Sequence, residues 1–144
     1  MRDSFEMNTP ESTQIVIGQR TSDHVSIERI SAPNHEGWFH ASVTVQSAVW
    51  SGNLRAEFTA GELRRFGLEI ERLYEELNGM AELRPMEPFL ELTFQGDGRG
   101  HIKVSGTAYH RLGAGTCLKF EFELDQTQLP SIAKALIQAD PELR

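Results

Sequence analysis

Alternating apolar and polar residues between Phe89 and Leu129 constrain the fold more than any other part of this chain. An apolar residue at every second position is typical of a strand with one buried face. Two glycine-containing connections, residues 96–100 and 113–115, divide the segment and suit tight hairpins. We therefore expect three consecutive antiparallel strands. Their inward residues are predicted to be Leu90, Leu92 and Phe94, then Ile102, Val104, Gly106 and Ala108, then Leu118, Phe120, Phe122 and Leu124.

Two shorter apolar stretches precede this segment near the start of the chain. Gln14–Gln19 contains three consecutive β-branched residues and is the first expected strand. The second strand contains Val25, Ile27 and Ile30, and its apolar spacing changes from two to three. Such a change indicates a β-bulge just before Ile30. Ser31–Gly37 is rich in turn-forming residues and is predicted to be a loop.

Trp38–Gln46 shows the same alternation over nine residues and predicts a half-buried strand. Leu54, Ala56 and Phe58 continue the pattern in the strand that follows. Trp50 lies on the same side of that strand by parity, so we expect it in the core. The inward row of the earlier strand is predicted to be Phe39, Ala41, Val43 and Val45.

The next segment has the signature of a helix start. Thr59 and Glu62 are spaced as in a capping box, in which each side chain bonds the backbone amide of the other residue. Apolar residues then recur at three- and four-residue steps, which predicts an amphipathic helix over Ala60–Asn78 that ends at Gly79. Ala81–Pro88 contains two prolines and is predicted to be an irregular crossover.

A second amphipathic helix, capped by Asp125 or Thr127, is predicted to carry the apolar residues Leu129, Ile132, Ala133, Leu136 and Ile137. The expected order is ββββ-α-βββ-α, that is, about seven strands in a mostly antiparallel sheet with two helices. This pattern is typical of an α+β domain, with the helices covering the inner face or plugging the ends of a curled sheet. Residues 1–13 are polar and are predicted to be a flexible lead-in, so the single domain is placed at residues 14–144.

Charge and cysteine content narrow the function classes. The formal net charge of −7 argues against a nucleic-acid binder, which needs a basic surface, and against an anionic membrane surface. It favours a basic protein partner. Cys117 is the only cysteine, so neither an internal disulfide nor a multi-cysteine zinc site can form. The sequence shows no signal peptide and no membrane span, which favours the cytoplasm.

Residue patterns that carry catalysis or cofactor binding are missing from the sequence. The glycine-rich residues 96–100 lead into a strand rather than a helix, so they do not form a phosphate-binding loop. The five histidines have no metal-ligand spacing, and no serine-nucleophile motif occurs. Glu121 and Glu123 share a face that alternation directs to solvent. We therefore predict a non-enzymatic protein without catalytic, cofactor-binding or metal-binding residues.

The outward face of the predicted sheet is the candidate interaction surface. It mixes acidic and basic side chains, and large aromatic residues share its parity, as is common in protein interfaces. The predicted protein-binding residues are Trp38, His40, Phe89, Glu91, Tyr109, Glu121 and Glu123.

Three segments resemble the small bacterial immunity proteins of the WapI type: Glu62–Leu83, Leu90–Gly106 and Leu118–Pro130. The last of them, with the run FEFELDQTQL, is the most specific. The resemblance implies a non-enzymatic protein that binds a secreted toxin domain and blocks its active site. It also implies that the toxin attacks RNA, and such toxins tend to be basic. It supplies no catalytic residues to transfer to this chain.

Two other functions fit the sequence. A small-molecule binding module would need an apolar pocket between the sheet and the helices, and a ligand would then raise the melting temperature. An enzyme would need a cleft that brings His40 or His101 close to carboxylates.

Overall fold

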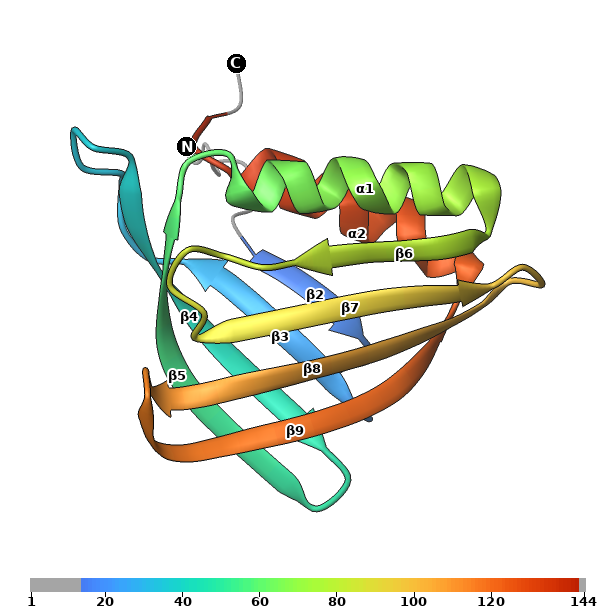
Figure 1. Ribbon diagram of the computed structural model, residues 1–144, viewed down its shortest axis with the longest axis horizontal. Helices are drawn as coiled ribbons and strands as arrows, with labels where there is room; N and C mark the ends of the chain where they lie inside the picture. Colours follow the sequence, from blue (N-terminus) through green and yellow to red (C-terminus); the bar gives the residue numbers. More distant parts are fainter. Residues whose placement is uncertain (1–13, 143–144) are drawn as a thin grey trace, which may run out of the picture.

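The computed structural model describes residues 14–142 and shows two four-stranded antiparallel sheets with two helices along one side (Figure 1). The element order is ββββ-α-ββββ-α. The predicted α+β architecture is confirmed, with eight strands in two sheets instead of about seven in one. The predicted lead-in, residues 1–13, lies outside the described residues.

The first sheet is a simple meander in the order β2-β3-β4-β5. In each strand every second side chain points to the inner face of the sheet. These inward side chains are apolar in all four strands. Phe39 and Phe58 are opposite each other in the register, with ring centroids 5.9 Å apart. The strands are β2 (Gln14–Gly18), β3 (His24–Arg29), β4 (Trp38–Ser47) and β5 (Trp50–Thr59).

The second sheet repeats this arrangement in the order β6-β7-β8-β9. Its three long strands are those predicted from the alternation, and the predicted inward rows face the core. Gly98 and Gly100 have φ of +82° and +101° in the connection from β7 to β8, as the glycine-rich turn requires. The strands are β6 (Asn78–Leu83), β7 (Leu90–Asp97), β8 (His101–Arg111) and β9 (Ala114–Asp125).

The helices α1 (Glu62–Glu76) and α2 (Leu129–Ala139) pack against each other along one side of the two sheets (Figure 1). A short 3₁₀ turn, Gln126–Gln128, precedes α2, and its cap is the predicted Asp125, whose carboxylate accepts the amide of Thr127 at 2.9 Å. α1 lies beside edge strand β6, and α2 contacts edge strand β2. The opposite edges, β5 and β9, are not paired with each other.

Strand β6 replaces the start of the predicted irregular crossover. Ala81 and Leu83 are buried and pair with Phe94 and Leu92, whereas the first three residues of the strand are exposed. Side chains of α1 satisfy its free edge: Glu69 accepts the amide of Glu82 at 2.9 Å, and Arg72 donates to the carbonyl of Met80 at 3.1 Å. The helix therefore closes this edge with polar side chains.

Three further local predictions are wrong. Trp50 is 65% exposed, because β5 starts beyond the region where the sheets cover each other. The register between β3 and β4 is continuous, so the strand has no bulge, and Ile30 lies outside it with 47% of its surface exposed. α1 ends at Leu77, which adopts the left-handed conformation with φ of 61°, rather than at Gly79.

The start of α1 is held by a residue from the other end of the chain. Glu62 accepts the amide of Thr59 at 2.7 Å, which is one half of the predicted capping box. The cap of the helix is Gly61, whose amide donates to Asp140 at 2.9 Å, and the amide of Arg64 donates to the same carboxylate at 2.9 Å. Asp140 is only 1% exposed. This contact joins the end of α2 to the first turn of α1.

Candidate functional site

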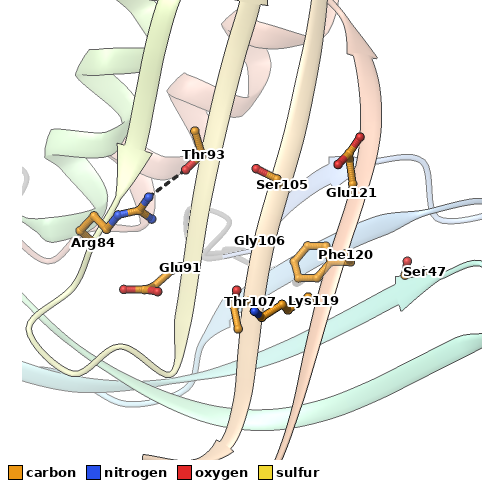
Figure 2. Close-up of a pocket in the computed structure, with 10 residues that line it drawn as sticks. All are labelled: Ser47, Arg84, Glu91, Thr93, Ser105, Gly106, Thr107, Lys119, Phe120 and Glu121. Carbon is orange, nitrogen blue, oxygen red and sulfur yellow. Dashed lines mark hydrogen bonds between the residues drawn. The ribbon is translucent and has the colours of Figure 1, made fainter.

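A shallow hollow of about 550 Å³ lies over β7, β8 and β9 on the outer face of the second sheet (Figure 2). Most of its side chains come from outward positions of these strands, so the strand registers determine their spacing. Three lining residues are exceptions: Phe120 is an inward residue, Ser47 comes from the end of β4 in the first sheet, and Arg84 follows β6. Polar groups of both charges and several hydroxyls surround it. The lining residues are Ser47, Arg84, Glu91, Thr93, Ser105, Gly106, Thr107, Lys119, Phe120 and Glu121.

A glycine lies at the centre of this hollow. Gly106 is opposite Leu92 on one side and Phe120 on the other, and it carries no side chain to fill the inner layer. The Phe120 ring takes that space, since a Cβ on Gly106 would lie only 2.5 Å from Phe120 Cζ. The same Cβ would lie 2.8 Å from the carbonyl oxygen of Glu91. Gly106 therefore allows the aromatic ring to lie close against β8.

One side of the hollow is ordered by an arginine. Arg84 donates from Nη2 to Thr93 Oγ1 at 3.0 Å, as Figure 2 shows, and the same nitrogen is 3.2 Å from Glu82 Oε2. These bonds fix the guanidinium beside Glu91. The opposite side of the hollow carries Lys119 and Glu121. The arrangement suits the recognition of a partner surface that carries charges of both signs. A partner bound in a wrong orientation would place its charges beside like charges of the hollow.

A second hollow of about 430 Å³ continues along the strands toward the β7–β8 turn and includes Lys103 and Glu123. Here Asp97 accepts the amide of Arg99 at 2.7 Å and lies 3.1 Å from His101 Nδ1. The hydrogen bond from the Arg99 amide is the main cause that lowers the pKa of Asp97, and His101 adds to it. The carboxylate is therefore favoured in its charged form in the folded protein.

The lowered pKa of Asp97 predicts how acid affects the stability of this turn. A carboxyl whose folded pKa is depressed adds stability above its unfolded pKa of about 3.9, and that stability is lost as the pH falls through the folded pKa. We expect Asp97→Asn to lower the melting temperature at about pH 6 and to have less effect as the pH falls to about 3. Thermal unfolding at several pH values measures this. If the variant and the wild-type chain differed in melting temperature by the same amount at every pH, the stabilising role assigned to the Asp97 charge would be wrong.

The model of the Immunity protein WapI-like family matches residues 17–139 of this chain. The chain belongs to that family. The match confirms the family predicted from the three sequence segments. A search of the curated proteins finds no match. Membership in the WapI-like family implies a protein-binding role as an immunity protein, and members of such a family are generally not enzymes.

Four of the predicted binding residues of this WapI-like protein lie on the second sheet. Glu91 and Glu121 line the first hollow, and Glu123 lines the second. Tyr109 lies farther along β8, in a different cleft near the β8–β9 turn. The structure therefore brings the three carboxylates onto one continuous face. Arg84 is a lining residue that the sequence prediction missed, because it follows the unrecognised strand β6.

The other three predicted residues are elsewhere. Trp38 and His40 belong to β4 of the first sheet, where they pair with Thr59 and Glu57. His40 Nδ1 is 3.8 Å from Glu57 Oε2, which is too long for a hydrogen bond. Phe89 is partly buried and packs against the core, so the expected outward orientation is not observed. Trp38 and His40 therefore lie on a different sheet from the three carboxylates.

Within residues 14–142, no group of three histidine, cysteine or acidic side chains is placed to hold a metal ion. No helix in the same residues is long and apolar enough to cross a membrane. The space between the helices and the second sheet is filled by core side chains, including Phe66 and Phe94 with ring centroids 5.3 Å apart.

Proposed function

We propose that this chain neutralises a cognate toxin domain by binding it through the outer face of the second sheet. The observation that carries the proposal is the continuous polar face around Glu91, Glu121 and Glu123 in a member of the WapI-like family. The proposed partner is a basic, RNA-attacking domain. A chain of net charge −7 would attract such a domain over a long range.

The mixed charges of this face give the proposed contact its specificity. Arg84, Lys103 and Lys119 lie among the carboxylates, so a correctly oriented partner must present cations and anions in matching positions. Complementary patterns of this kind raise the association rate and penalise wrong partners. Binding there would neutralise the toxin by covering its active site, and no reaction on the immunity protein is needed. The proposed compartment is the cytoplasm.

A tagged pull-down from the native bacterium, at low and high salt, tests this function. We expect one dominant basic partner that is retained at about 0.05 M salt and is largely lost at about 0.5 M, since screening weakens exposed charge pairs. Mass spectrometry identifies the partner. The tagged variant in which Glu121 and Glu123 are replaced by lysine is the matched control and should retain much less of it. Capture of no partner at either salt concentration would contradict the proposal.

A further inference from the structure

The chain turns directly from the end of α1 into β6 at residues 77–79 (Figure 1). Leu77 and Gly79 both have positive φ, 61° and 101°. Asn78, Gly79 and Met80 are exposed, so solvent reaches the whole start of the strand. Asn78 is one of three asparagines in the part of the chain that the structure describes, and of these three it alone is followed by glycine.

The backbone nitrogen of Gly79 lies beside the carboxamide of Asn78. The amide of Gly79 donates to Asn78 Oδ1 at 3.1 Å, which brings the nitrogen close to the carbon that carries this oxygen. Gly79 has no side chain to obstruct an approach, and a Cβ built on it would meet no atom within 4 Å. A nucleophile and an electrophile that are neighbours in an open, exposed segment can react without any diffusional step.

The other two asparagines are held away from such a reaction. Asn34 Oδ1 accepts the amides of Glu36 and Trp38 at 2.9 and 3.0 Å, and Asn53 Oδ1 accepts the hydroxyl of Thr44 at 2.7 Å. Histidine and leucine follow them, and their side chains crowd the backbone nitrogen. Within residues 14–142, the side chain of Asn78 makes no hydrogen bond other than the one to the Gly79 amide.

We propose that Asn78 is a site of spontaneous covalent modification, which converts it to aspartate and isoaspartate. The Gly79 nitrogen loses its proton to solvent and bonds to Asn78 Cγ, and Nδ2 leaves as ammonia, so a succinimide ring forms. One water then opens the ring. Addition at Cγ gives aspartate, and addition at the backbone carbonyl carbon of Asn78 gives isoaspartate. The reaction consumes only this water and is independent of the proposed toxin contact.

The modification places a negative charge where the fold tolerates it poorly. Asn78 is opposite Asp97 in the register of β6 and β7, and like charges directly opposite each other destabilise a sheet. The new carboxylate would also follow the end of α1, where the helix dipole disfavours negative charge. Isoaspartate adds one atom to the backbone, which disturbs the pairing of Gly79 with Gly96. The modified chain should therefore have a lower melting temperature.

Incubation of the full chain in mildly alkaline buffer, followed by tryptic digestion and mass spectrometry, tests this proposal. One fragment contains Asn78, and another contains both Asn34 and Asn53. We expect the Asn78 fragment to exchange NH for oxygen about tenfold faster or more than the other fragment, because its reacting groups are adjacent and uncrowded. Two products of equal mass should separate by chromatography. Asn78→Gln is the matched control and should remain unmodified, since its longer side chain would have to close a larger ring.

The same incubation in urea separates the effect of the fold from that of the sequence. Conversion of Asn78 in the unfolded chain without conversion in the folded chain would overturn the proposal, and so would equal rates in the two fragments. The fully converted chain should melt at a lower temperature than the fresh chain, whereas incubated Asn78→Gln should keep its melting temperature. An unchanged melting temperature after full conversion would overturn the assigned effect on β6.

Discussion

Replacing Asp140 by alanine is expected to lower the free energy of unfolding by about 3 kcal/mol, because buried amides would lose their acceptor. The carboxylate accepts three backbone amides, those of Gly61, Arg64 and Glu142, at 2.8–3.0 Å. Gly61 is the cap of α1 and Arg64 lies in its first turn, where the amides have no partner within the helix. Asp140 therefore stabilises the helix and joins it to the end of α2.

Urea unfolding monitored by circular dichroism measures this effect. Asp140→Asn is the matched control, since it keeps one side-chain oxygen and should cost about half as much. Ser131→Ala, on an exposed position of α2, should change the stability by less than about 0.5 kcal/mol. If Asp140→Ala were as stable as the wild-type chain, solvent or another group would have to satisfy these amides, and the assigned role of Asp140 would be wrong.

Replacing Glu121 and Glu123 together by lysine is expected to weaken partner binding at least a hundredfold, about 2.7 kcal/mol. The double change removes two negative charges and adds two positive ones, a net change of +4, so a basic partner would meet repulsion where it met attraction. Both side chains are exposed on β9, and folding should therefore be unaffected. Isothermal titration with the partner identified by the pull-down measures the change.

The matched control for this prediction is Glu71→Lys with Glu75→Lys. These residues are exposed on α1, and their replacement changes the net charge by the same amount on a different surface. The control should reduce the association rate modestly through long-range attraction and leave the dissociation rate nearly unchanged. Equal losses of affinity in both double variants would show that only net charge matters, and unchanged affinity in the β9 variant would place the interface elsewhere.

Alternation predicted most of the fold because each long strand has one buried face. Strand β6 was missed, since only Ala81 and Leu83 of its residues are buried and α1 covers its edge with polar side chains. Parity placed Trp50 in the core. Parity shows on which face of a strand a side chain lies, but it does not show how far the opposing sheet extends over that face. The chain forms two sheets because α1 separates the first four strands from the last four. The sequence could not predict this division, since hairpins show the same alternation in one sheet as in two.

The candidate site was only partly predictable for the same reason. Parity identifies which residues face outward, and it grouped Glu91, Glu121 and Glu123 correctly on one face. It cannot show that Trp38 belongs to a different sheet, because that depends on contacts between distant strands. Asp140 gave no signal in the sequence, since the amides that it caps lie more than seventy residues earlier.

Neutralisation of the proposed toxin is measured by an RNA-cleavage assay with the purified partner domain and increasing amounts of this chain. We expect cleavage to fall linearly and to stop at one chain per toxin domain, and we expect the lysine variant of Glu121 and Glu123 to leave cleavage intact at the same ratio. Full RNA cleavage in the presence of a saturating, stably bound wild-type chain would contradict the proposed neutralisation.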